Sequence, residues 1–254
     1  FLNTQKFRNN FKQKSLAGLK PNKSMMNLIK HIAVCTFVGA ALSSNATTVT
    51  VDSGILTLGY MNWTPTAYTL ANYPGGGGTG GGSWGLADLQ AGFSGNQLTL
   101  APTINAYAAG NAYWTNPDGT GANQMDASIY AENTGTYVST TLTFTFDVFA
   151  NTLVSPYTST AFIKEFAPDY SSFTISSVAL TPGIGSVSLA ISGNAADHVQ
   201  WGFETFGPDA NPVGAEALGS VIINPVAVPE PTTLALAGLG GTALLTMIRR
   251  RNGK

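Results

Sequence analysis

Two tryptophans beside flexible segments offer the plainest chemistry in the chain. Trp84 comes just after a glycine-rich tract, residues 74–82, and Trp114 precedes an Asn-Pro turn. An aromatic ring presents a flat apolar face on which a sugar can stack, and loop positions favour exposure of that face. We therefore predict Trp84 and Trp114 as candidate glycan-binding residues, with packing in the protein core as the alternative role for each.

His198 lies in a segment with the alternation of a half-buried strand. Over residues 198–204 apolar and polar residues alternate, so that Trp201 faces the core and His198 shares the outer face with Gln200 and Glu204. A solvated surface histidine is one interpretation, and a hydrogen bond to a glycan is the other. We add His198 and Gln200 to the candidate glycan-binding residues.

Oxygen-bearing side chains gather in one turn, residues 116–126. Asn116, Asp118, Asn123 and Asp126 are donors of the hard kind that calcium prefers, but the spacing of an EF-hand is absent. A site with several histidines is excluded, because His198 is the only histidine after residue 31. We assign no metal ligand and no cofactor, and calcium is the one ion that the sequence leaves open.

The sequence motifs for catalysis fail on their context. Residues 81–85 match G-x-S-x-G, but a nucleophile elbow needs a strand before the serine, and a glycine tract stands there. A glycosidase needs two carboxyl groups at a fixed separation, which the sequence cannot supply. We predict no catalytic residue and no enzyme, with an exported glycan-active enzyme as the weakest of three classes.

The charges are segregated along the chain. Of the 12 lysines and arginines, seven lie within residues 1–30 and four within residues 249–254. Residues 47–226 hold twelve acidic residues and one basic residue, Lys164. Nothing in that segment could neutralise phosphates, so we exclude nucleic acid as a partner.

The N-terminal part predicts export. Residues 1–24 are basic and polar and begin at Phe1, and we interpret them as an extension upstream of the natural start. Residues 25–46 have a short basic segment, an apolar run at 32–42 and the small residues Ser44 and Ala46. This is the pattern of a secretory signal peptide, which signal peptidase would cleave between Ala46 and Thr47.

The C-terminal segment, residues 227–254, has three parts in order. A Pro-Glu-Pro triplet precedes an uncharged run, residues 232–248, and an arginine cluster follows it. At 1.5 Å per residue this run reaches about 26 Å as a helix, close to the thickness of a bilayer core. We predict a single transmembrane helix with the arginines on the cytoplasmic side. The flanking residues are Pro229, Glu230 and Pro231 at the start and Arg249, Arg250 and Arg251 at the end.

These three parts resemble the PEP-CTERM sorting signal of Gram-negative bacteria. The resemblance rests on the Pro-Glu-Pro triplet, the apolar run and the terminal arginines, all within residues 227–254. It implies processing by an exosortase, a precursor anchored in the inner membrane, and a final place at the cell surface or in the extracellular matrix. Hosts of this family typically make exopolysaccharide and biofilm.

The segment between these signals, residues 47–226, predicts one all-β domain. Short alternating runs are separated by Gly, Pro, Asn and Asp, which is typical of an antiparallel β-sandwich or jelly roll. The glycine tract 74–82 is predicted as a flexible loop. The expected strands are 48–51, 55–61, 97–100, 127–132, 141–149, 160–166, 173–180, 185–192, 198–204 and 220–223.

We expect an exported, non-catalytic protein of the cell surface or extracellular matrix, associated with biofilm exopolysaccharide. The alternative is a carbohydrate-binding module that uses loop aromatics, with calcium as a candidate bridge. The excess of acidic residues would repel an anionic polysaccharide. The alternative therefore implies a neutral glycan or one that calcium links to the protein.

Overall fold

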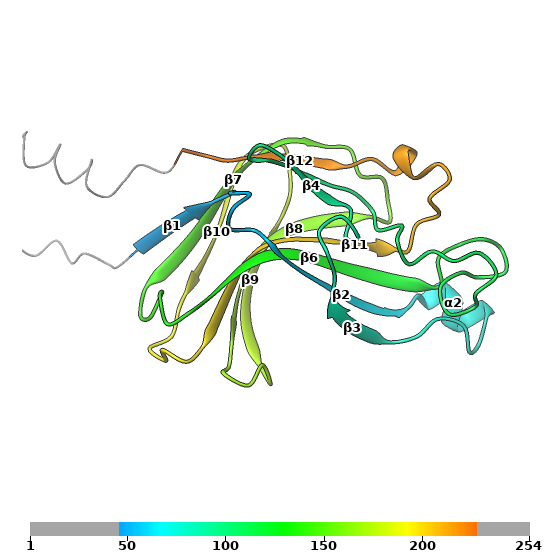
Figure 1. Cartoon of the computed structure of the whole chain (residues 1–254), viewed down its shortest axis with the longest axis horizontal. Helices are drawn as coiled ribbons and strands as arrows, with labels where there is room; N and C mark the ends of the chain where they lie inside the picture. The colour runs from blue at the N-terminus through cyan, green and yellow to red at the C-terminus, as the bar shows by residue number, and fades with distance from the viewer. Residues whose placement is uncertain (1–45, 228–254) are drawn as a thin grey trace, which may run out of the picture. The chain divides into compact units, whose positions relative to one another are not determined.

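The computed structural model describes residues 46–227, which form two six-stranded sheets (Figure 1). Sheet A has the order β1-β7-β12-β5-β4, with β10 paired to β7 as well. Its strands are β1 (Ala46–Thr50), β4 (Ala91–Ser94), β5 (Gln97–Leu100), β7 (Thr141–Asn151), β10 (Gly183–Ala190) and β12 (Val221–Asn224).

Sheet B has the order β3-β2-β6-β11-β8-β9, and every pair in it is antiparallel. The three long strands β6, β11 and β8 lie side by side at its centre. Its strands are β2 (Leu58–Pro65), β3 (Gly80–Ser83), β6 (Asn123–Thr134), β8 (Thr158–Phe166), β9 (Phe173–Ala179) and β11 (His198–Pro208).

The core lies between the two sheets and follows the predicted alternation. On β7 of sheet A the inward residues, Phe144 and Phe146 among them, are 0% and 2% exposed. Their rings lie 5.0 and 5.5 Å from the ring of Phe203 on β11 of sheet B. Trp201, also predicted to face inward, is buried. Burial of these large apolar side chains is what holds the sheets face to face.

The prediction of an all-β sandwich is confirmed, with one correction to its antiparallel description. Strand β1 runs parallel to β7, with Ala46 opposite Thr141 and Thr50 opposite Thr145. The two strands are far apart in the sequence, and only such a long connection permits parallel pairing. All ten predicted strands are present, with their ends shifted by a few residues.

The prediction of a loop over 74–82 is wrong at its end, because Gly80–Ser83 forms strand β3. Gly80 pairs with Trp63 of β2, and a Cβ atom at Gly80 would lie 2.4 Å from the Trp63 ring. The glycine therefore provides room for the ring. This is a reason for glycine in a strand that the sequence pattern does not display.

Helix is scarce in residues 46–227. Helix α2 (Ala67–Asn72) begins at the N-cap Thr66, whose hydroxyl accepts a hydrogen bond from the backbone N–H of Thr69. A short 3-10 helix, η1, spans Ala215–Leu218. No helix in this part of the chain is long and apolar enough to cross a membrane. The predicted signal peptide up to residue 45, including Ser44, and the predicted transmembrane run 232–248 lie outside the described residues.

Candidate functional site

A groove of about 610 Å³ crosses the outer face of sheet B. Because side chains alternate along a strand, the residues that do not face the core line this groove. The lining comes from strands β2, β3, β6, β8, β9 and β11 and from the loop that joins β8 to β9. The lining residues are Leu58, Tyr60, Asn62, Ser83, Asp126, Ser128, Tyr130, Glu132, Lys164, Phe166, Tyr170, Phe173 and Gln200.

Strand register brings the polar lining residues into rows across the sheet. Asp126 of β6 lies opposite Asn62 of β2. Farther along β6, Glu132 lies opposite Gln200 of β11, which in turn lies opposite Lys164 of β8. Residues from distant parts of the sequence therefore meet on one surface because the strands are adjacent.

A charged cluster stands around Asp126. The Nζ atom of Lys164 lies 3.3 Å from Oε2 of Glu204 and 4.3 Å from the centre of the Phe162 ring. The Oδ1 atom of Asp126 is buried and has no hydrogen-bond partner. Burial, and next the negative charge of Glu204, raise the pKa of Asp126 to about 6. An unpaired buried oxygen of this kind is costly in a protein.

The other end of the groove is a hydrogen-bonded network around Glu132. Its carboxylate accepts a bond of 2.9 Å from the Tyr170 hydroxyl and one of 2.6 Å from Nε2 of Gln200. The ring of His198 is stacked on that of Tyr170 at 4.4 Å, and its Nδ1 lies 2.8 Å from the Thr134 hydroxyl. Burial, and next the bond to Glu132, raise the pKa of Tyr170 to about 12.

The structure therefore brings together two of the four predicted glycan-binding residues. Gln200 lines the groove, and His198 stands beside it against Tyr170. His198 is half-buried and packed, whereas the plainer interpretation was a solvated histidine. Whether either residue touches a glycan stays a prediction.

Neither Trp84 nor Trp114 lines this groove. Both are half-buried and pack against the core, and Trp63 stands between them with ring centres 6.3 and 5.6 Å away. Nε1 of Trp63 donates to the Tyr113 hydroxyl at 2.8 Å. The two tryptophans belong to one aromatic cluster. Their contacts are therefore those of packed side chains, which was the alternative role predicted from the sequence. Their binding of a glycan stays a prediction.

Aromatic side chains that the sequence pattern does not single out form the walls of the groove. Phe166 lies 5.5 Å from Tyr170 and 5.1 Å from Phe173, ring centre to ring centre. Tyr170 and Phe173 are 48% and 55% exposed, and Tyr130 is half-buried on β6. The available signal was an aromatic residue at an outward position of a strand, where a polar residue is the usual choice.

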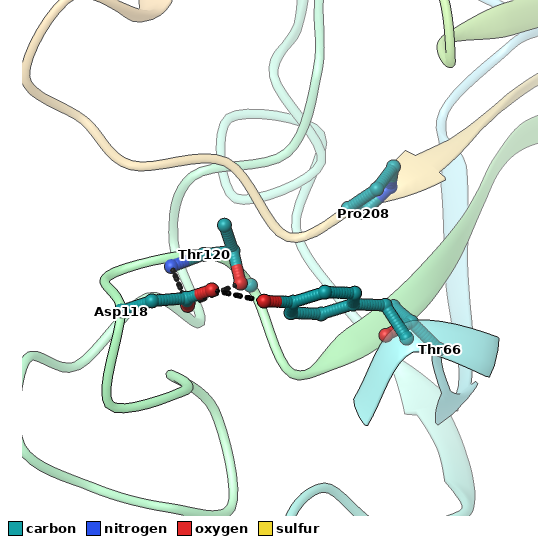
Figure 2. A pocket seen from close by; sticks show the side chains of 6 residues that line it. Thr66, Asp118, Thr120 and Pro208 are labelled. Carbon is teal, nitrogen blue, oxygen red and sulfur yellow. Dashed lines mark hydrogen bonds between the residues drawn. The ribbon is translucent and has the colours of Figure 1, made fainter. Parts of the chain in front are cut away.

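A second hollow, of about 420 Å³, lies beside the turn 116–126 (Figure 2). The Tyr68 hydroxyl donates to Oδ2 of Asp118 at 2.7 Å, while Oδ1 of Asp118 accepts bonds from the backbone N–H and the hydroxyl of Thr120. These bonds lower the pKa of Asp118, and the bond to Asp118 is the main cause that raises the pKa of Tyr68 to about 12. The carboxylate of Asp118 is thus engaged within the protein.

The four oxygen-bearing side chains of this turn do not converge on one point. Asn116 is buried and donates through Nδ2 within the protein, and Oδ1 of Asn123 accepts a bond from the backbone of Gly78. Asp126 faces the groove of sheet B. Among residues 46–227 no group of three or more His, Cys, Asp or Glu could hold a metal ion. Calcium binding stays a prediction without assigned ligands.

The structure defines the class of this molecule as a β-sandwich with one polar, aromatic groove on an outer sheet face. Residues 227–251 match the PEP-CTERM protein-sorting motif, so the resemblance that Pro229, Glu230 and Pro231 suggested is confirmed. The chain thus carries the sorting signal of an exported protein that an exosortase processes from a membrane-anchored precursor. No curated protein and no solved structure matches the chain.

Proposed function

We propose that this protein is a non-catalytic component of the cell surface or extracellular matrix that holds a polysaccharide in the groove of sheet B. One observation carries the proposal. A groove of about 610 Å³ combines exposed aromatic rings with amide, hydroxyl and carboxylate groups on a rigid sheet. Ligand sites usually have this size range and this mixture of apolar surface and a few polar groups.

The shape of the groove suits a chain rather than a small solute. From Asp126 to Glu132 it follows seven residues of β6, whose six steps span about 20 Å at about 3.4 Å each. Sugar rings have an apolar face for stacking and hydroxyl groups at their rim. Tyr130, Phe166 and Phe173 offer the stacking surface, and Asn62, Ser83 and Ser128 offer hydrogen bonds.

The state of the carboxylates supports binding without catalysis. A glycoside hydrolase needs a pair of carboxyl groups free to act on the two sides of one bond. Here Glu132 accepts bonds from Tyr170 and Gln200, and Glu204 pairs with Lys164. The carboxyl group beside Asp126 is that of Glu204, and the ammonium group of Lys164 already engages it, so the groove offers no two free carboxyl groups.

The route to the matrix follows from the two terminal signals. In the proposal, signal peptidase cleaves between Ala46 and Thr47, and the C-terminal tail holds the precursor in the inner membrane until an exosortase releases it. The sandwich would then reach the surface or matrix, where polysaccharide is the available partner. The excess of acidic residues makes nucleic acid an unsuitable one.

Replacing Pro229, Glu230 and Pro231 by alanine is expected to stop processing of the precursor. The full-length chain should accumulate in the inner membrane, because the exosortase would lose the triplet that marks its substrate. Immunoblots of membrane and extracellular fractions measure this, with replacement of Pro225 and Val226 by alanine as the control. Normal release of the triplet variant would contradict processing by an exosortase.

Replacing Tyr130 by alanine is expected to weaken binding of the host's exopolysaccharide about ten-fold, since a lost aromatic contact costs roughly 1.5 kcal/mol. Calorimetric titration of the full chain in a polyoxyethylene detergent, which carries no sugar headgroup, measures the affinity. The matched control is Phe149→Ala, because Phe149 is an aromatic residue 68% exposed on strand β7 of the other sheet. Equal affinities of the wild type and Tyr130→Ala would overturn the placement of the site.

A further inference from the structure

The groove of sheet B is selective in charge as well as in shape. Asp126 and Glu132 line it as carboxylates, and Lys164 is the only lysine or arginine in its lining. The ammonium group of Lys164 is already paired with Glu204 at 3.3 Å. The groove therefore has negative charge in excess and no free cation with which to hold an anionic sugar.

The two lining carboxylates differ in their hydrogen-bond partners. Glu132 is satisfied by the Tyr170 hydroxyl and the Gln200 amide, with Nδ1 of His198 at 3.8 Å. Asp126 has a buried Oδ1 atom without a partner, and its nearest charged neighbours are Glu204 and Lys164. Burial in a site without a partner is unfavourable for the charged form of a carboxylate. Asp126 lines the groove, so a positively charged ligand group beside it would offset that penalty through its opposite charge.

We propose that the groove takes a glycan with free amino groups, that is, a partly or fully N-deacetylated amino sugar polymer, and that Asp126 binds one of its ammonium groups. This inference rests on the proposed polysaccharide binding and names its chemical class. The aromatic side chains stack on the sugar rings, and the hydrogen bonds of Glu132 hold the far end of the groove in place. Asp126 makes the groove selective for a positively charged sugar. Uronic acid or sulfated polymers are repelled by the same carboxylates.

The titration of the Asp126 carboxyl group and of the sugar amino group sets the pH range in which the two bind each other. Asp126 has a pKa raised to about 6, so it is mostly ionised just above that value, where amino groups of sugar polymers are still partly protonated. The groups around the pair are Asn62 on β2, Glu204 on β11 and Lys164 on β8. An ammonium bound at Asp126 would favour its ionised form, because an opposite charge nearby lowers the pKa of a carboxyl group.

The test compares three oligosaccharides of equal length at pH 6.5, with the full chain in a polyoxyethylene detergent. They are a glucosamine oligomer, its N-acetylated form and a galacturonic acid oligomer. We expect the glucosamine oligomer to bind about ten-fold more tightly than the N-acetylated one and the galacturonic acid oligomer to bind least, from the strength of a charge-assisted hydrogen bond.

Asp126→Asn keeps the shape of the side chain and removes its charge. This variant should lose the preference for the glucosamine oligomer, so that its affinities for the amino and N-acetyl oligomers come within about two-fold of each other. The control is Asp147→Asn, which removes the same charge from strand β7 of sheet A and should change nothing. Equal affinity of the wild type for the amino and N-acetyl forms, or a preference for galacturonate, would overturn the proposed preference for amino sugars. Either result would still be consistent with a polysaccharide bound in the groove. No saturable binding of any oligomer, or of the host's polysaccharide, overturns both.

Discussion

Replacing Asp209 by asparagine is expected to make the protein more stable at pH 8, by about 2 to 4 kcal/mol. Asp209 is 1% exposed at the end of β11, and neither of its carboxylate oxygens has a hydrogen-bond partner. Burial raises its pKa to about 7. At pH 8 the folded protein must therefore hold an unpaired buried charge, whereas the uncharged amide resembles the protonated acid.

The direction of the pH dependence follows from the same shift. In the unfolded chain the carboxyl group has its ordinary pKa of about 3.8, and in the folded chain burial raises that pKa to about 7. Between these values the folded state binds more protons than the unfolded state, so the free energy of unfolding falls as the pH rises. The contribution of Asp209 is fully present below about pH 4 and is lost by about pH 7.

Urea unfolding of the full chain at several pH values between 4 and 8 measures this effect. The difference between Asp209→Asn and the wild type should be small at pH 4 and should grow toward pH 8. Comparing the two proteins at each pH removes the contributions of the other shifted carboxyl groups, Asp118, Asp126 and Asp169. A difference that does not depend on pH would show that Asp209 has a cation or hydrogen-bond partner when folded.

Replacing Gly202 by alanine is expected to destabilise the fold by about 3 kcal/mol or more. Gly202 lies in β11, paired with Tyr130 of β6 on one side and with Phe162 of β8 on the other. A Cβ atom at this position would lie 2.0 Å from the carbonyl oxygen of Ile129 and 2.7 Å from Cα of Tyr130. These are backbone atoms of a central strand, so the two strands must move apart.

The control for this change is Gly92→Ala in strand β4. A Cβ atom at Gly92 has nothing within 4 Å, so the substitution should change the free energy of unfolding by less than about 1 kcal/mol. Urea denaturation midpoints of both variants give the comparison. Similar midpoints for Gly202→Ala and Gly92→Ala would mean that strands β6 and β11 are not packed as closely as the structure has them.

The strands were predictable because a strand with one buried face alternates apolar and polar residues along the sequence. Leu142, Phe144 and Phe146 alternate with threonines, and the structure buries the first set between the sheets. The parallel pairing of β1 with β7 carries no such local signal, since it joins residues about half the domain apart in the sequence, such as Ala46 and Thr141. Strand β3 was hidden because three of its four residues are glycines, which have no pattern to show.

The candidate site was only partly predictable, because it is a property of strand order. Gln200 and His198 were found from the outer face of a single strand. Asp126 was placed in a turn with calcium ligands, but it belongs to β6 and stands opposite Asn62. No feature of one strand states which other strand will lie beside it. The sorting tail was predictable from the sequence alone, because its motif is a continuous run of residues and does not depend on the fold.

The most direct test of the polysaccharide groove is amide hydrogen exchange of the full chain with and without the host's exopolysaccharide. The proposal predicts slower exchange in β6 and β11 and in residues 167–172, which carry Tyr130, Gln200 and Tyr170. Exchange near Trp114, which does not line the groove, should not change. Protection confined to the segment around Trp114, or no protection at a saturating concentration, would contradict the groove as the binding site.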